Sequence, residues 1–185
     1  MLADILQEAE EKMKKAVEGL RRELASLRAG RANPALLEKV LVSYYGTPTP
    51  VNQLATVSSP EARLLVIQPW DRNILPEIEK AILKSDLGLT PSSDGTVIRI
   101  TIPQLTEERR SELVKVARKK AEEFRVMVRN ARREANDKLK ASEKNKEASE
   151  DEVKRAQEKV QKTTDNYIQI IDKILATKEA EIMEV

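Results

Sequence analysis

Three long segments of the chain repeat apolar residues at alternating spacings of three and four, the pattern of an amphipathic helix. They run from Leu2 to Ala29, from Thr106 to Ser142, and from Ser149 to the C-terminal end. The apolar positions of the second segment are Leu113, Ala117, Ala121, Phe124, Val128, Ala131, Ala135 and Leu139. Helices with one apolar stripe bury it against each other, so the pattern predicts a three-helix bundle.

Residues typical of helix ends flank these segments. Gly30 can adopt the left-handed conformation that ends a helix, and Thr106 can cap the start of the second segment. Ser149 and Glu152 have the spacing of a capping box, which places the start of the last helix. We expect its inner face to consist of Val153, Ala156, Val160, Tyr167, Ile171, Ile174 and Ile182.

Between residues 35 and 104 the pattern changes to short β-rich runs separated by turn residues. The runs predict strands at residues 40–45, 54–57, 63–67 and 97–102, a connection at 46–50, a short helix at 74–83, and a turn at Asp94-Gly95 before the last strand. The predicted fold class is therefore α+β. A small β/α/β domain (residues 31–104) is inserted between the first and second helices of a bundle formed by residues 1–30 and 105–185.

The composition restricts the chemistry of the chain. Charged residues make up 35% and aromatic residues 3%, a balance that suits long helices. Cysteine and histidine are absent, which excludes thiolate and imidazole as nucleophile, base or metal ligand. We therefore expect no metal, no cofactor and no catalytic residue. An enzyme that uses Asp71, Asp86 or Tyr44 is the weaker alternative, because these residues lie beside turn signals without an identifiable partner.

The sequence gives no sign of a membrane partner. No apolar run approaches the roughly 20 residues that span a bilayer. The N-terminal residues carry acids early and lack the continuous apolar region of a signal peptide. We expect a cytoplasmic, monomeric protein.

A second stripe on the central helix is basic. It follows the apolar stripe by one residue, and so lies about 100° round the helix; its members are Arg118, Glu122, Arg125, Arg129, Arg132 and Asn136. Residues 107–142 contain 12 Lys and Arg against 7 Asp and Glu, whereas residues 31–104 contain 7 of each kind. The excess of positive charge therefore belongs to this helix and not to the small domain.

Two interpretations of the basic stripe remain open from spacing and charge. Guanidinium groups suit phosphate oxygens in fixed geometry, so the stripe can follow the backbone of folded RNA. Alternatively it is a solvated face whose arginines pair with Glu122, Glu134 or acidic residues on neighbouring helices. Arg28 and Arg31 likewise either compensate the dipole of the first helix or extend the basic surface.

Five stretches, in order along nearly the whole chain, together resemble the bacterial ribosome recycling factors. They are residues 27–34 (LRAGRANP), 44–50 (YYGTPTP), 85–89 (SDLGL), 105–110 (LTEERR) and 128–137 (VRNARREAND). Each alone is a weak signal, but five in register in a chain of the family's length are specific. The resemblance says little about the chain after Ala141.

The resemblance implies an L-shaped, non-catalytic factor whose helical bundle contacts large-subunit ribosomal RNA on the 70S ribosome. With elongation factor G and GTP, such factors split the post-termination ribosome into subunits and release mRNA and deacylated tRNA. The RNA-contacting arginines of the family match Arg129 and Arg132, and its hinge matches Gly30-Arg31 and Pro103-Gln104.

Other features are weighed beside this resemblance. Arg28, Arg31, Arg125 and Arg133 are expected to widen the positive field around the two matched arginines. The competing hypothesis is a coiled-coil adaptor, in which the inserted domain binds a protein and the arginines are ordinary surface charge.

Overall fold

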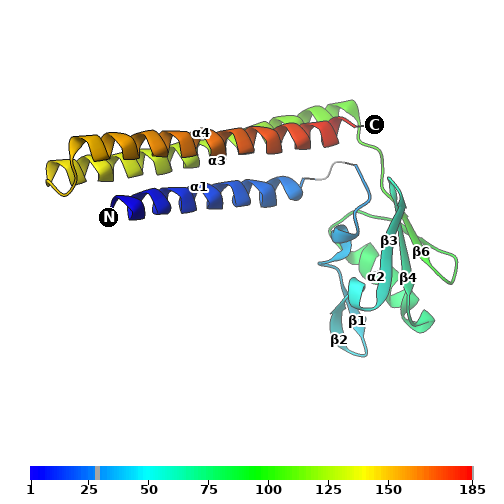
Figure 1. Ribbon diagram of the computed structural model, residues 1–185. Helices are drawn as coiled ribbons and strands as arrows, with labels where there is room; N and C mark the ends of the chain where they lie inside the picture. The colour runs from blue at the N-terminus through cyan, green and yellow to red at the C-terminus, as the bar shows by residue number, and fades with distance from the viewer. Residues whose placement is uncertain (28–29, 185) are drawn as a thin grey trace. The chain divides into compact units, whose positions relative to one another are not determined.

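The computed structural model describes residues 1–27 and 30–184 (Figure 1). The chain divides into two compact units, Met1–Ala29 with Thr106–Val185 and Gly30–Leu105. The first unit is built from long helices and the second from short strands with one helix, and the second is inserted between the first and second long helices. The predicted fold class is confirmed.

The long helices are α1 (Leu2–Ala25), α3 (Glu107–Lys144) and α4 (Glu150–Met183). All eight apolar positions predicted for α3 are buried. Near the α3–α4 turn they pack with α1 and α4 in a cluster that contains Ile5, Ala9, Ala135, Leu139, Val153, Ala156 and Val160. The repeat of three and four residues in the sequence therefore identified the buried face correctly.

The predicted caps of α3 and α4 are confirmed. The Thr106 hydroxyl accepts a hydrogen bond from the Arg109 N–H at 3.1 Å. At the start of α4, Ser149 and Glu152 each accept from the other's backbone N–H, which is the full capping box. These bonds satisfy N–H groups that have no partner inside the helix.

The predicted end of α1 was wrong. The helix ends at Ala25, and Ser26 occupies the C-terminal cap, with its hydroxyl donating to the Glu23 carbonyl at 2.6 Å. A serine that bonds back to the last turn satisfies a carbonyl there, so the helix ends before Gly30. Gly30 has φ +75°, the left-handed conformation expected, but does not cap the helix.

The inner face of α4 differs from the prediction at three positions. Tyr167 and Ile174 are only half-buried, and Thr164, which was not predicted, is buried. The Thr164 hydroxyl donates to the Val160 carbonyl at 2.7 Å, and this bond allows a polar side chain to sit in the core.

The small unit contains six strands, one α-helix and short 3-10 turns. The strands are β1 (Leu41–Tyr44), β2 (Thr47–Pro50), β3 (Ala55–Glu61), β4 (Leu64–Pro69), β5 (Pro91–Ser93) and β6 (Ile98–Thr101). The helix α2 spans Leu75–Lys84 and follows the 3-10 turn Arg72–Ile74; similar turns lie at Pro34–Leu37 and Val51–Gln53. β1 and β2 form a two-stranded antiparallel sheet, and a second antiparallel sheet has the order β3-β4-β6-β5.

A single hydrophobic core holds the small unit together. It joins residues from both sheets and from the inner face of α2, among them Val42, Ile67, Ile78, Ile82 and Ile98, all fully buried. The predicted turn before β6 is confirmed, because Asp94 accepts hydrogen bonds from the Thr96 and Val97 N–H groups. These bonds lower the pKa of the Asp94 carboxyl, the bond from Val97 most, with a further contribution from Arg99.

Two strands of the small unit were missed by sequence reasoning. β5 has only three residues. β2, predicted as a connection, contains two prolines, which usually exclude a strand because they lack an N–H group. Tyr45 and Gly46, with φ of 49° and 82°, form the two-residue turn between β1 and β2, as in a tight hairpin with both central residues left-handed.

Candidate nucleic-acid interface

The basic stripe of α3 lies along the seam between α3 and α4. Arg118 bonds to Glu179 of α4, Arg125 to Asp172, and Arg132 to Gln161. A stripe one residue on from the buried face lies beside the neighbouring helix, so these contacts follow from the helical spacing. The face is therefore a helix–helix boundary and not an isolated row of free cations.

Charged residues along this seam are spaced by seven in both helices, although Arg132 contacts Gln161 and not the acidic residue at the matching heptad position, Asp165. Arg118, Arg125 and Arg132 are spaced by seven on α3, and the acidic residues Asp151, Glu158, Asp165, Asp172 and Glu179 have the same spacing on α4. Charged residues that flank an apolar seam at heptad spacing pair across it when the register matches. The sequence analysis left open pairing with acidic residues on neighbouring helices, and this holds for Arg118 and Arg125. The heptad spacing is the signal that could have named their partners.

Arg125 is the most enclosed of these arginines. Its side chain is 18% exposed, and its guanidinium donates to Asp172 at 2.7 Å and to Glu122 at 3.1 Å. Two carboxylates therefore neutralise the charge of Arg125. Arg125 joins α4 to α3. Because both carboxylates are bonded to its guanidinium, it is not placed to contact a phosphate directly.

Arg129 falls outside the heptad and remains accessible. It is 44% exposed, and its one ion pair among the described residues is with Glu122 of its own helix, at 3.1 Å. The hydrogen bond from Arg129, followed by that from Arg125, lowers the pKa of Glu122 below its ordinary value. Exposed ion pairs of this kind contribute about 0–1 kcal/mol, so a phosphate can replace Glu122 at small cost.

Arg132 lies at a heptad position but bonds to an amide and not to a carboxylate. Its Nη1 atom donates to the neutral Gln161 side chain at 2.9 Å, and Gln161 in turn donates to Asp165. Its Nε atom is buried and has no hydrogen-bond partner in the part of the chain that the structure describes, and the same holds for Asn136 Oδ1. The Gln161 side chain thus lies between Arg132 and Asp165, and no carboxylate among the described residues bonds directly to the Arg132 guanidinium.

Arg133 is exposed, and within residues 1–27 and 30–184 no hydrogen bond or ion pair engages its side chain. It lies four residues after Arg129, so the two side chains are neighbours on the outward face of α3. Arg129, Arg132 and Arg133 together are named here the arginine cluster. It holds three guanidinium groups, and the one carboxylate bonded to the cluster, among the described residues, is the exposed Glu122.

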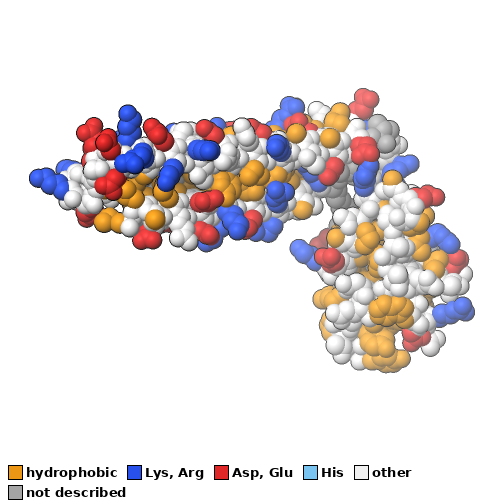
Figure 2. Space-filling view, in the orientation of Figure 1, with side chains coloured by type: hydrophobic (Ala, Val, Ile, Leu, Met, Phe, Trp, Pro, Cys, Tyr) orange, Lys and Arg blue, Asp and Glu red, His pale blue; other side chains and the backbone are white. Residues whose placement is uncertain are grey.

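The opposite seam, between α1 and α3, has its charges neutralised in pairs. Lys12 bonds to Glu134 at 2.7 Å, Lys138 to Glu8 at 2.9 Å, and Lys120 to Glu23 at 3.2 Å. Glu134 therefore pairs with lysines and not with an arginine, contrary to the alternative considered from the sequence. Figure 2 shows basic and acidic side chains interspersed along the bundle face in view.

Comparison with known proteins identifies the family of the chain. The family model described as ribosome recycling factor matches residues 20–183. The chain belongs to the ribosome recycling factor family. It is 65% identical to a ribosome-recycling factor of Syntrophomonas wolfei and 66% identical to that of Heliobacterium modesticaldum, over 185 residues and the full length of each.

Solved structures of ribosome recycling factors resemble this chain as well. A solution structure of the ribosome recycling factor is 53% identical, with a TM-score of 0.77, covering 100% of this chain and 98% of that one. A second, 52% identical with a TM-score of 0.64 over the whole of both chains, represents the T. thermophilus factor with E. coli elongation factor G on the E. coli post-termination complex.

The remaining residues suggested by the sequence belong to other parts of the chain. Arg28 lies outside the described residues. Arg31 is exposed and belongs to the small unit, where Gly30 adopts φ +75°. Pro103 and Gln104 are exposed in the irregular segment between β6 and α3.

Two of the three residues considered for an enzyme, Asp71 and Tyr44, serve local structure, and the third, Asp86, lines a groove of the small unit. Asp71 accepts a hydrogen bond from the Asn73 N–H at 3.0 Å and so caps a 3-10 turn, while the Tyr44 ring packs edge-on against Tyr45. In the described part of the chain, no three carboxylates lie close enough together to hold a metal ion. Within the same residues, no helix has both the length and the apolar character needed to cross a membrane.

Proposed function

We propose that this chain acts as a ribosome recycling factor in the cytoplasm. It binds the post-termination 70S ribosome and, with elongation factor G and GTP, splits it into subunits and so releases mRNA and deacylated tRNA. The observation that carries the proposal is the full-length identity of 65% and 66% to two ribosome-recycling factors. The relative represented with elongation factor G on the post-termination complex supports the same partners for this chain.

We further propose that the arginine cluster binds phosphates of large-subunit ribosomal RNA. Arg129 and Arg133 supply exposed guanidinium groups, and Arg132 supplies one whose bonded partner is a neutral amide. Such groups bind phosphate oxygens through charge-assisted, two-pronged hydrogen bonds. In this proposal Arg28 and Arg31 add to the positive field, whereas Arg125, paired with Glu122 and Asp172, contributes by holding α4 in register.

The chain itself carries out no chemistry in this mechanism. The GTPase partner supplies the free energy, and the small unit, residues 31–104, moves relative to the bundle, residues 1–30 and 105–185. We propose that the two crossings, Gly30-Arg31 and Pro103-Gln104, absorb the change in backbone angles. The positive φ of Gly30 and the irregular backbone at Pro103 and Gln104 support this role.

A subunit-splitting assay tests the proposed function. Post-termination 70S ribosomes are mixed with this protein, elongation factor G and GTP, and light scattering is followed with time. We expect the scattering to fall to the level of separated subunits only when all three are present. Binding without any loss of scattering would favour the coiled-coil adaptor instead.

Replacing Gly30 by valine is expected to slow splitting and leave ribosome binding nearly unchanged. Gly30 has φ +75°, and an added Cβ would lie 3.0 Å from Leu105 Cγ. A side chain at this positive φ strains the backbone by about 1–3 kcal/mol. The strain lies in the Gly30-Arg31 connection between the two units and not in the arginine cluster. Splitting rate and binding constant are measured on the same ribosome preparation.

The matched control is Gly88→Val. Gly88 also has a positive φ, +66°, but no atom lies within 4 Å of its added Cβ. Valine at position 88 introduces a similar backbone strain into the small unit, because φ is positive there too. It does not alter the two connections between the units. If both variants slow splitting to the same extent, the effect reports the stability of the small unit and Gly30 has no part in the movement.

A further inference from the structure

The β1–β2 hairpin has two edges that differ in their capacity to bind another strand. The outward-facing residues of β2 are Pro48 and Pro50, which lack N–H groups, so this edge offers no donor. The outward-facing residues of β1 are Leu41 and Ser43, which retain both N–H and C=O groups. Prolines block one edge of the sheet, and the other edge remains able to pair.

The hydrogen-bonding pattern of the hairpin establishes which backbone N–H and C=O groups face away from the partner strand. The Val51 N–H donates to the Val40 carbonyl at 3.3 Å, and the two-residue turn makes Tyr44 and Thr47 a hydrogen-bonded pair. Alternate residues of an antiparallel strand point to opposite edges. The N–H and C=O groups of Leu41 and Ser43 therefore point away from β2, and they have no hydrogen-bond partner among the described residues.

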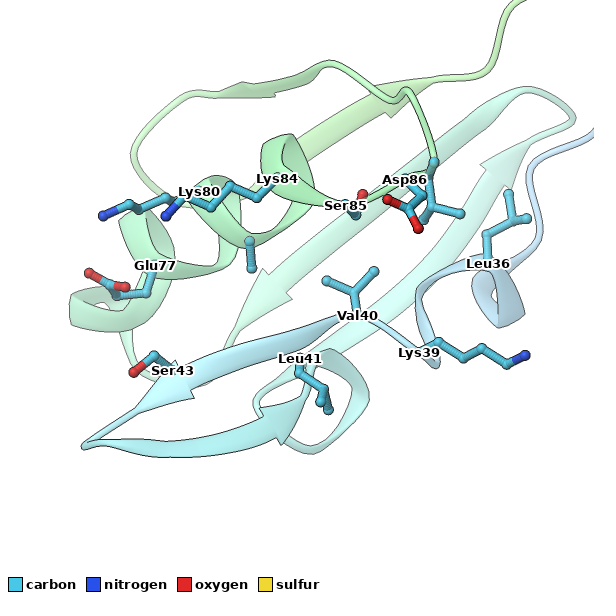
Figure 3. A pocket seen from close by; sticks show the side chains of 12 residues that line it. Leu36, Lys39, Val40, Leu41, Ser43, Glu77, Lys80, Lys84, Ser85 and Asp86 are labelled. Carbon is cyan, nitrogen blue, oxygen red and sulfur yellow. The ribbon is translucent and has the colours of Figure 1, made fainter.

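A groove runs beside this open edge. It has a volume of about 690 Å³ and lies between β1, which contributes Leu41 and Ser43, and α2, which contributes Lys80 and Ala81 (Figure 3). A second hollow of about 370 Å³ shares Ser43 with it and continues to the hairpin turn. A segment laid in this groove would follow the whole length of β1.

The charges on the groove identify the chemistry of its occupant. Lys80 and Lys84 are one turn apart on α2, and their amino groups lie at the same end of the groove in Figure 3. Neither forms an ion pair within the described residues, and Lys39 at the other end is also unpaired there. The groove carries three lysines against two carboxylates, Glu77 and Asp86, and the second hollow adds Asp71, so the net charge along the path is close to zero. The two unpaired amino groups of Lys80 and Lys84, one turn apart on α2, supply the attraction for a carboxylate of the occupant.

We propose that an extended, acidic segment of a partner protein adds to β1 as a third strand of the hairpin sheet. Its backbone bonds to the free N–H and C=O groups of Leu41 and Ser43, a small apolar side chain contacts Ala81 and Val40, and a carboxylate pairs with Lys80 or Lys84. This interaction is separate from the arginine cluster, which belongs to the other unit.

A capped heptapeptide of alternating valine and glutamate serves as the probe for this strand addition. It is titrated into the isotope-labelled full-length protein, and amide shifts and amide hydrogen exchange are recorded by NMR. We expect slower exchange of the Leu41 and Ser43 amides on binding, with no change at the Val42 amide, which already faces β2. A peptide with lysine in place of glutamate is expected to bind more weakly.

Two variants test the backbone and charge components separately. Ser43→Pro removes an outward donor that β2 does not use, and is expected to weaken binding about tenfold, whereas Ser43→Ala is expected to have no effect. Lys80→Glu with Lys84→Glu is expected to reverse the preference between the two peptides. Protection of the Val42 amide verifies that each variant keeps the hairpin.

Three results would overturn the proposal. They are equal binding of the peptide to Ser43→Pro and the unmodified protein, absence of binding at millimolar peptide, and protection of Leu41 and Ser43 that rises with protein concentration without peptide. The last result would show that a second copy of the chain occupies the edge.

Discussion

Replacing Arg129, Arg132 and Arg133 together by alanine is expected to weaken binding to post-termination ribosomes at least about a thousandfold, since each charged hydrogen bond contributes about 1.5 kcal/mol or more and the three sum to about 4.5 kcal/mol. The slope of log K against log salt is expected to fall by about 2–3, because each phosphate contact releases roughly 0.7–0.9 of a counterion. Both quantities come from binding isotherms at several salt concentrations.

The size of the effect depends on the charges being available before the RNA arrives. Arg129 must give up only an exposed pair with Glu122, Arg132 is bonded to a neutral amide, and Arg133 is exposed. None of the three has to break a buried ion pair among the described residues, so most of the phosphate interaction remains as binding free energy. Arg125, held by two carboxylates and 18% exposed, would have to lose such pairs first.

A second triple variant provides the control for net charge. Lys154, Lys159 and Lys162 are exposed on α4, and none of them forms an ion pair among the described residues. Their replacement by alanine removes the same charge from the same unit and is expected to leave the salt slope within about 0.5 of the original. An equal drop in slope for both triple variants would mean that overall charge, and not the arginine cluster, drives binding.

Replacing Phe124 by alanine is expected to lower the free energy of unfolding by about 3 kcal/mol, the lower end of the range for this change. Phe124 is 7% exposed and lies on the buried face of α3. Its ring also borders a groove of about 590 Å³ between α1 and α3, so part of the space left by the ring opens to water and does not remain an empty cavity. Urea unfolding followed by circular dichroism measures the change.

The close approach of α1 to this ring supplies a double-mutant test. A Cβ added at Gly19 would lie 2.7 Å from Phe124 Cε1, so Gly19→Val overpacks the contact and is expected to cost about 1–3 kcal/mol. In the Phe124→Ala background the same substitution is expected to be nearly neutral, because the ring is gone. Equal costs in both backgrounds would show that the two residues are not coupled.

Several features of this recycling factor follow from neighbouring residues along the chain and were predicted correctly from them. The buried face of α3, the caps at Thr106 and Ser149 and the turn at Asp94 depend on spacings of a few residues, which local backbone geometry converts directly into structure. The five motifs that pointed to the family are local in the same sense. Prolines in β2 misled the prediction because their effect depends on which edge their missing N–H would face.

Sequence alone therefore determined the α+β architecture, the helical bundle and its basic helix, because each is a property of short-range periodicity and composition. Which arginines remain free was decided only by the tertiary structure. That outcome depends on the register of α4 against α3, where residues far apart in the chain meet: Arg118 with Glu179, Arg125 with Asp172, and Arg132 with Gln161. The open edge of β1 is of the same kind, because pairing with β2 directs the backbone groups of Leu41 and Ser43 outward.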